Sequence, residues 1–483
     1  MMCETMVFFP SPGIGHLIPM VELGKLILRH HPSFSITILI TTPPFETGAT
    51  APYMSRVASE IQAITFIELP PVELSVTQID HSLTFMFEWL LLCKPAVAQA
   101  LQSISEKTVI RAFVMDSFCS TALDVATDLG VPAYFFYASA AAFLTVFLYF
   151  PELHKQNPGK FRDLACDLVL PGLPPLPPSL IPEVMQDRNK KVYEWFLYHS
   201  AKVPQGKGIL LNSFEELEPL GLKALQALMD HTHGGVPRPP VYWIGPLVGG
   251  EDRSGGDNDT LQWLDSQPAG SVVFLSFGSV GRFSEAQIRE IAVGLENSGQ
   301  RFLWVVRSPP REDNDRTKRL RPSEPDLEEL LPQGFLQRTA DKGLVMKSWA
   351  SQAAVLSCAA VGGFVSHCGW NSVLESVCAG VPMAAWPIYA EQAMNAFLMV
   401  GEMGLAVAVE RGDDGFVKAE EVARCVRELM ESEVGKRIRE RMAAVKDSAT
   451  RALRVGGSSL KNLEAVVNAG KHFSSSSSLE TEA

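Results

Sequence analysis

Two polar side chains follow predicted strands in the first quarter of the chain. His16 closes the segment FPSPGIGH, in which an apolar run is followed by a Pro/Gly turn and the start of a helix. Asp116 ends another apolar run in the segment FVMDSF. Because the carboxyl ends of parallel strands lie at one edge of a sheet, we expect both side chains at that edge. A carboxylate fixes the tautomer of a neighbouring imidazole and raises its basicity, so the pair suits a general base.

Both residues also have a structural interpretation. A single histidine at the start of a helix is commonly structural, and Asp116 can cap the helix that follows it. The capping role of Asp116 is compatible with catalysis. We therefore predict that His16 is a catalytic base and that Asp116 orients it.

A second candidate group lies between Trp349 and Gln392. Its apolar residues 362–365 predict a strand, and the segment His367–Ser372 turns into a helix. The free N–H groups and the positive end of a helix bind anions without net positive charge. Two members have structural alternatives: Trp349 suits a hydrophobic core, and Glu375 suits a capping box with Ser372.

Short apolar runs alternate with helix-length periodic segments along most of the chain. The candidate strands are Met6–Phe9, Ser35–Thr41, Ala112–Met115, Gly208–Asn212, Ser271–Phe277 and Phe302–Val306. The candidate helices are Ile14–Leu28, Thr121–Leu129 and a segment from the capping box Ser284–Gln287 to Gly299. This alternation predicts an α/β fold with two Rossmann-like domains, whose parallel sheets face each other across a cleft.

Proline- and glycine-rich segments interrupt this alternation. Residues 168–182 predict a surface excursion, residues 309–329 a mobile loop, and residues 236–257 the domain boundary. We therefore assign residues 1–245 to an N-terminal domain and residues 246–470 to a C-terminal domain. We leave open that the last helix packs on the first domain, and we expect residues 471–483 to form a disordered tail.

Composition excludes several classes of protein. The 483 residues include 42 Lys and Arg against 54 Asp and Glu, a formal charge of −12, which argues against a nucleic-acid binder. The eight cysteines contain no C-x-x-C pair, so zinc ribbons and disulfide scaffolds are not expected. The D-x-D sequences of the chain do not indicate a convincing metal site either, and we expect no metal. The segment FPSPGIGH is not G-x-G-x-x-G, which argues against an NAD-dependent oxidoreductase.

One uncharged stretch is long enough to span a bilayer. It runs from Leu129 to Pro151, but Gly130, Pro132 and the aromatic run Tyr134–Tyr137 favour a buried strand, a turn and a buried helix. The N-terminus has no basic and apolar pattern of a signal peptide. We therefore predict a cytoplasmic protein without a membrane anchor, and a monomer.

The segment from Trp349 to Gln392 resembles the donor-binding signature of plant family 1 UDP-dependent glycosyltransferases. The H-C-G-W-N-S core and the terminal Glu-Gln fall where that family has them. SVVFLSFGS, RFLWVVR, LLNSFEELEP and PSPGIGH also look like family landmarks, so the resemblance covers essentially the whole chain. PSPGIGHL, TTPP and FVMDSF are similar to the flavonoid and chalcone O-glucosyltransferase branch. The family implies a GT-B-like fold, in which residues 1–245 would bind the acceptor and residues 246–470 the UDP-sugar donor.

The resemblance implies roles for individual residues. The diphosphate is expected at His367, Asn371 and Ser372, with Ser279 in a second such position. Trp349 would stack on uracil, Gln352 would contact the uridine, Glu375 would accept from the ribose hydroxyls, and Glu391 and Gln392 would bind the sugar. Ala350 and Gly369 complete the expected donor site.

Two positions bear on the sugar. Glucuronosyl-transferring relatives carry arginine where this chain has Trp370, and an indole cannot neutralise a uronate. Gln392 is what glucose-using members carry, so UDP-glucose is the expected co-substrate. The acceptor pocket is expected at Gly15, Phe118, Phe136, Ser139, Phe143 and Met185.

The resemblance and the residues together predict an inverting UDP-glucose-dependent glucosyltransferase that acts on a hydroxyl of a small phenolic acceptor. Two alternatives stay open: a C-glycosyltransferase for the same acceptors, and a non-catalytic UDP-sugar sensor. The sequence leaves the identity of the acceptor and the modified hydroxyl undetermined.

Overall fold

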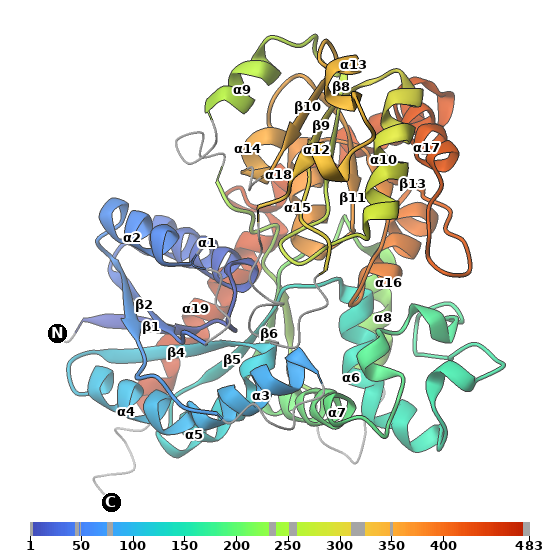
Figure 1. Cartoon of the computed structure of the whole chain (residues 1–483). Helices are drawn as coiled ribbons and strands as arrows, with labels where there is room; N and C mark the ends of the chain where they lie inside the picture. The colour runs from blue at the N-terminus through green and yellow to red at the C-terminus, as the bar shows by residue number, and fades with distance from the viewer. Residues whose placement is uncertain are drawn as a thin grey trace, which may run out of the picture. The chain divides into compact units, whose positions relative to one another are not determined.

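The computed structural model describes residues 3–43, 48, 50–74, 81–230, 238–250, 258–310, 324–347 and 351–476. The chain divides into two compact units, one formed by Met1–Leu247 with Arg451–Ala483 and the other by Val248–Thr450 (Figure 1). Leu247 lies inside the proline- and glycine-rich segment 236–257. Each unit is a parallel sheet covered by helices, which confirms the predicted fold class.

The first unit contains a seven-stranded parallel sheet in the order β3-β2-β1-β4-β5-β6-β7. Its strands are β1 (Glu4–Phe9), β2 (Phe34–Ile40), β3 (Ile64–Glu68), β4 (Val109–Asp116), β5 (Ala133–Tyr137), β6 (Gly208–Leu211) and β7 (Val241–Trp243). The strand order reverses between β1 and β4, where ligand sites of open α/β sheets form. In the register of this pair Phe9 faces Met115, so the two strands end side by side.

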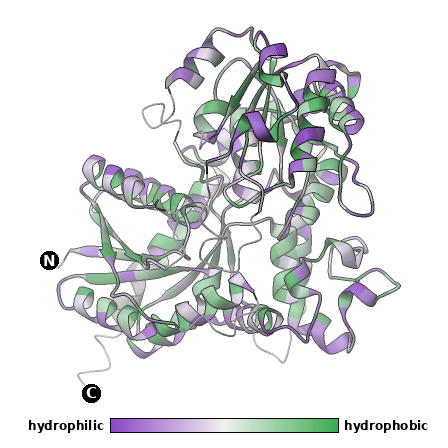
Figure 2. Cartoon of the chain, in the orientation of Figure 1, coloured by the Kyte–Doolittle hydropathy of each residue, from purple (hydrophilic) through white to green (hydrophobic). Residues whose placement is uncertain are grey.

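Helices cover both faces of the first sheet. They are α1 (Ile14–His30), α2 (Thr50–Glu60), α3 (Ser82–Leu92), α4 (Lys94–Ser105), α5 (Leu123–Asp128), α6 (Ala141–Gln156), α7 (Lys191–Lys202), α8 (Pro219–Asp230) and α19 (Ser458–Ser476). The helices α1, α2 and α19 pack on one face, where α1 contributes Met20 and Val21 to a core that includes Phe8 and Ile38 of the sheet. Figure 2 shows this division, with apolar residues along the strands and polar residues on the outer turns of the helices.

The second unit contains a six-stranded parallel sheet in the order β10-β9-β8-β11-β12-β13. Its strands are β8 (Val272–Ser276), β9 (Arg301–Val305), β10 (Gly343–Met346), β11 (Val361–Ser366), β12 (Met383–Ala385) and β13 (Ala406–Ala408). Its helices are α9 (Asn258–Asp265), α10 (Glu285–Ser298), α12 (Leu327–Leu330), α13 (Phe335–Arg338), α14 (Gln352–Leu356), α15 (Trp370–Ala379), α16 (Gln392–Leu398), α17 (Ala419–Glu431) and α18 (Glu433–Ala452), the last of which crosses the boundary between the units.

The predicted cap of α10 forms only in part. Ser284 accepts a hydrogen bond from the backbone N–H of Gln287 at 3.3 Å, and Gly299 ends the helix with a left-handed φ of 73°. The Gln287 side chain does not complete the capping box, because it bonds both backbone polar groups of Val417 instead. The start of the helix is therefore set by the local Ser284 cap, whereas the Gln287 side chain bonds to a loop that is distant in the sequence.

The uncharged stretch 129–151 forms a turn, β5 and the first part of α6, as predicted. In the part of the chain that the structure describes, no helix is both long and apolar enough to cross a bilayer. The predicted helix Thr121–Leu129 is wrong at its start, since residues Ser117–Ala122 form a 3₁₀ helix and α5 begins at Leu123.

Two predicted irregular segments contain more order than expected. In the segment 168–182, Leu168 and Leu176 form an antiparallel bridge. Apolar side chains anchor this excursion, since Leu168, Leu170, Leu173 and Leu176 are buried. In the segment 309–329, α12 forms at Leu327–Leu330, whereas residues 311–323 lie outside the described residues. The helix α19 reaches Ser476, six residues into the predicted tail; residues 477–483 lie outside the described part.

Candidate active site

The carboxyl edge of the first sheet brings His16 and Asp116 together. His16 lies in the first turn of α1, just after β1, and Asp116 is the last residue of β4. Because β1 and β4 are neighbours, residues 100 positions apart meet: Nδ1 of His16 lies 2.8 Å from Oδ2 of Asp116. The predicted contact between base and carboxylate is therefore present in the structure.

The Asp116 carboxylate is buried and fully engaged. Its side chain is 3 % exposed, and its Oδ1 accepts hydrogen bonds from the Ser11 hydroxyl at 2.8 Å and the Phe118 N–H at 2.9 Å. Burial alone would raise the pKa of Asp116, but the His16 charge and these hydrogen bonds together hold that pKa below its usual value. Asp116 thus caps the 3₁₀ helix and also holds the imidazole, so its two predicted roles coexist.

One aromatic side chain lies beside the imidazole. The ring of Phe118, a predicted acceptor residue, lies 6.0 Å from the ring of His16 and 5.3 Å from that of Phe87. His16 itself keeps 35 % of its side chain exposed, so a ligand can reach it. A half-buried imidazole beside an aromatic ring is suited to a flat apolar ligand.

The other predicted acceptor residues lie in different surroundings. Gly15 is exposed on α1, while Ser139 and Phe143 are buried at the start of α6. Phe136 and Met185 have no exposed surface: Phe136 belongs to the core that includes residues of α1, and Met185 lies in the 3₁₀ helix Glu183–Met185. A role for these two in contacting an acceptor stays a prediction.

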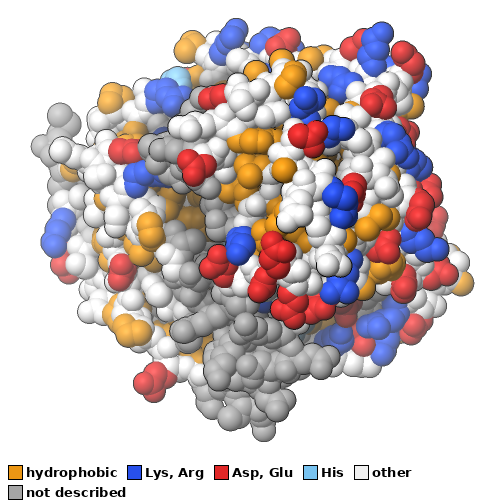
Figure 3. Space-filling model, turned by 45° about the horizontal axis from the view of Figure 1, so that its top comes forward, with side chains coloured by type: hydrophobic (Ala, Val, Ile, Leu, Met, Phe, Trp, Pro, Cys, Tyr) orange, Lys and Arg blue, Asp and Glu red, His pale blue; other side chains and the backbone are white. Residues whose placement is uncertain are grey.

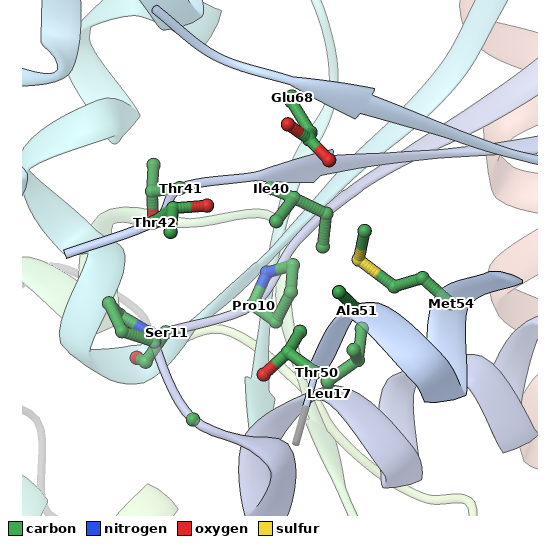
Figure 4. A pocket seen from close by; sticks show the side chains of 12 residues that line it. Pro10, Ser11, Leu17, Ile40, Thr41, Thr42, Thr50, Ala51, Met54 and Glu68 are labelled. Atoms are coloured by element: carbon green, nitrogen blue, oxygen red, sulfur yellow. The ribbon is translucent and has the colours of Figure 1, made fainter. Parts of the chain in front are cut away.

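A cavity of about 240 Å³ opens beside the loop before α1 (Figure 4). The loop residues Pro10–Gly13, the end of β2 and the start of α2 line it, together with Glu68. Ser11 belongs to this lining and also donates to Asp116. The cavity therefore adjoins the loop that positions the carboxylate.

In the second unit, β11 leads into α15 as predicted, and His367 lies in the turn between them. Gly369 is the N-cap residue of α15, so the backbone turns into the helix directly after His367. The imidazole is buried against Gly278 and Gly369, since a Cβ at either glycine would lie 2.6 Å from its Nε2. Burial, together with the charge of Arg307, lowers the pKa of His367 to about 4, so this histidine is neutral at pH 7.

Gln352 connects two predicted donor residues on α15. Its Nε2 donates to Oγ of Ser372 at 2.8 Å and to Oε2 of Glu375 at 2.5 Å. Burial raises the pKa of Glu375 to about 7, and the bond from Gln352 partly offsets this rise. Because Ser372 lies in the first turn of α15 and Gly369 is its N-cap, the capping-box alternative for Glu375 is wrong.

The other predicted donor residues occupy the ends of α15 and α16. Asn371 is half-buried beside Trp370, which begins α15 and is 2 % exposed. Glu391 is the N-cap residue of α16, and Oε1 of Gln392 accepts from the backbone N–H groups of Ile388 and Tyr389, both at 2.9 Å. Gln392 thus fixes the loop before α16, a role that the sequence did not predict.

Two members of the predicted donor site, Trp349 and Ala350, lie outside the described residues. Ser279 is exposed in the turn after β8, and its carbonyl accepts a hydrogen bond from Nη1 of Arg307 at 2.9 Å. The sequence analysis did not single out Arg307, although it ends the quoted segment RFLWVVR. Among the described residues, no group of three or more His, Cys, Asp and Glu side chains is arranged to hold a metal ion.

Comparison with known proteins points to one family. The sequence profile described as "UDP-glucoronosyl and UDP-glucosyl transferase" matches residues 248–448. Anthocyanidin 5,3-O-glucosyltransferase of Rosa hybrid cultivar is 44 % identical over 473 residues, covering 95 % of this chain and 97 % of that protein. Phloretin 2'-O-glucosyltransferase of Pyrus communis is 45 % identical over 484 residues, covering 96 % and 98 %.

A solved structure agrees with these relatives along the whole chain. UGT2 of Phytolacca americana, complexed with UDP-2-fluoro-glucose and pterostilbene, superposes with a TM-score of 0.85 at 36 % identity. The match covers 97 % of this chain and all of that protein.

Proposed function

Because this chain belongs to the UDP-glucuronosyl and UDP-glucosyl transferase family and is a glycosyltransferase, we propose that it transfers glucose from UDP-glucose to a hydroxyl of a small phenolic acceptor. The first unit would bind the acceptor, and the second would bind the donor. The contact between His16 and Asp116 is the observation that carries this proposal. UGT2 of Phytolacca americana was solved with UDP-2-fluoro-glucose and pterostilbene bound, and its similarity to this chain supports both substrate classes.

In the proposed mechanism, His16 acts through Nε2. Its Nδ1 is held by Asp116, which stabilises the Nδ1–H tautomer and the positive charge that develops on the ring. As the acceptor oxygen attacks the anomeric carbon with inversion, its proton passes to Nε2. The bond from this carbon to the diphosphate breaks, and the electron pair stays on UDP.

We propose glucose as the sugar from two residues, Trp370 and Gln392, of which Gln392 is the residue that glucose-using family members carry. Trp370 is buried at the start of α15 and offers no charge to a uronate, which supports glucose over glucuronate. The backbone N–H groups at this end of α15 are suited to the diphosphate. We expect that no metal is needed, and dialysis against a chelator would test this.

We also propose a monomeric cytoplasmic enzyme. All eight cysteines are free, which agrees with a reducing compartment. Figure 3 shows acidic and basic side chains interspersed on the face drawn, as expected for a protein without a nucleic-acid partner. Light scattering and cell fractionation would test the two statements separately.

The variant His16→Ala tests the proposed function. We expect it to lose glucosyl transfer by at least about 10²-fold while it still binds UDP, because the proton acceptor is removed and the donor residues belong to the other unit. UDP release is measured with a panel of phenolic acceptors, and UDP binding by calorimetry. Mass and the NMR coupling at the new linkage identify the bond formed.

His30→Ala, at the other end of the same helix, is the matched control and should retain full activity. Undiminished turnover in His16→Ala would remove the assignment of the base. A product linked through carbon would instead favour a C-glycosyltransferase.

A further inference from the structure

Arg307 is a half-buried cation beside the predicted diphosphate residues. It follows β9 by two residues, and its Nη1 donates to the Ser279 carbonyl at 2.9 Å. Ser279 belongs to the turn whose Gly278 packs against the His367 ring. Arg307 thus supports one wall of the site that the second unit offers to an anion.

The histidine at this site cannot supply the positive charge. His367 is buried and neutral at pH 7, and its Nδ1 has no hydrogen-bond partner among the described residues. The Arg307 charge lies close enough to disfavour protonation of that ring. A guanidinium stays charged even where burial lowers its pKa, as it does here, so Arg307 keeps a positive charge beside a neutral imidazole.

We propose that Arg307 is a cation of the diphosphate site, where it attracts UDP and stabilises the charge on the departing nucleotide. This inference rests on the proposed function. As the bond between the sugar carbon and the diphosphate oxygen breaks, the electron pair stays on the diphosphate and the acceptor proton passes to His16. A fixed guanidinium beside the diphosphate stabilises that charge more than it stabilises the bound substrate.

Arg307 could act only through its hydrogen bond to the Ser279 carbonyl, or it could act through its charge on the diphosphate. Two substitutions separate these roles. Arg307→Gln removes the charge but keeps an N–H donor, whereas Arg307→Lys keeps the charge and one donor. A charge that acts on phosphate affects UDP but not uridine, which has no phosphate. If Arg307 only held the Ser279 turn through its hydrogen bond, Arg307→Gln, which keeps a donor, would bind UDP as the wild type does.

The experiment measures binding of UDP and of uridine by calorimetry to wild type, Arg307→Gln and Arg307→Lys. We expect Arg307→Gln to weaken UDP about 10- to 100-fold with uridine unchanged, since hydrogen bonds to charged groups contribute roughly 1.5–3 kcal/mol. Arg307→Lys should stay within a few-fold of wild type. Arg301→Gln, at the other end of β9, is the matched control and should bind both ligands normally.

NMR titration of His367 provides a second readout, because its pKa should rise in Arg307→Gln and stay low in Arg307→Lys. The proposal is overturned if UDP affinity is unchanged in Arg307→Gln, or if uridine weakens as much as UDP. Failure of the proposed function is distinguishable from either result, because the wild-type protein would then bind no UDP or transfer no sugar.

Discussion

At the scale of single residues, the two oxygens of Asp116 have different partners. Oδ2 faces the imidazole of His16, whereas Oδ1 accepts from the Ser11 hydroxyl and from the backbone N–H of Phe118. The two bonds to Oδ1 fix the carboxylate plane, so the imidazole is held in one orientation. Ser11 therefore positions Asp116, and Asp116 positions His16, the proposed base.

Asp116→Asn should lower kcat by roughly 10²–10⁴-fold, because an amide cannot stabilise the charged imidazole and its NH₂ faces a nitrogen donor. The KM for UDP-glucose should change little, since the proposed donor residues lie in the second unit. Steady-state kinetics with a fixed phenolic acceptor measures both constants. Ser11→Ala keeps the carboxylate and should cost less than about tenfold; equal losses in the two variants would contradict this order.

At the scale of elements, a buried carboxylate caps the helix that begins next to Ser139. Oε2 of Glu218 accepts from the backbone N–H of Ala141 at 2.8 Å, and Oε1 accepts from the Ser213 hydroxyl at 2.5 Å. Glu218 is 2 % exposed, and burial raises its pKa to about 7 although these hydrogen bonds oppose the rise. The cap of α6 is thus supplied by a segment 77 positions away.

This cap should make stability depend on pH. A raised carboxyl pKa means that the folded state binds the proton more tightly than the unfolded state, so stability falls as pH rises from about 4.5 to about 7 and then levels off. Glu218→Gln removes this dependence. The free energy of unfolding of the variant, relative to that of the wild type, should therefore increase by roughly 1–3 kcal/mol from pH 5 to pH 8. Urea unfolding at the two pH values measures it, with exposed Glu216→Gln as the control. A constant difference across the range would contradict the assignment.

At the scale of the whole molecule, the C-terminal helix completes the first unit. The helix α19 packs against β4 and β7, and its residues Leu460, Leu463, Val466 and Val467 are buried in the core that contains Phe8 and Ile38 (Figure 1). Ser459 also donates to the carbonyl of Gly245 at 2.6 Å. The first unit therefore contains both ends of the chain.

Leu463→Ala should destabilise the first unit by about 2–4 kcal/mol, because it leaves a cavity where a 1 % exposed side chain fills the core. Calorimetry should show a lower unfolding midpoint. Lys461→Ala, exposed on the same helix, should leave that midpoint unchanged. If the two variants unfolded alike, α19 would contribute little to the core.

The sequence located the strands that carry the chemistry because their signals are local. The expected strand Met6–Phe9 and the observed β1 both end at Phe9. The expected helix and the observed α1 both begin at Ile14. The aromatic run Tyr134–Tyr137 was correctly assigned to a buried strand. Apolar periodicity, glycine caps and the signature between Trp349 and Gln392 all lie within short windows of the chain.

The sequence by itself therefore determined the fold class and the family, and it placed His16 and Asp116 at the same edge of the first sheet. Only the tertiary structure decided that Ser11 holds Asp116, that Glu218 caps α6, that Gln392 fixes its own loop, and that the charge of Arg307 acts on His367. Most of these contacts join segments tens to more than a hundred positions apart. They depend on strand order and side-chain packing, which no local pattern encodes.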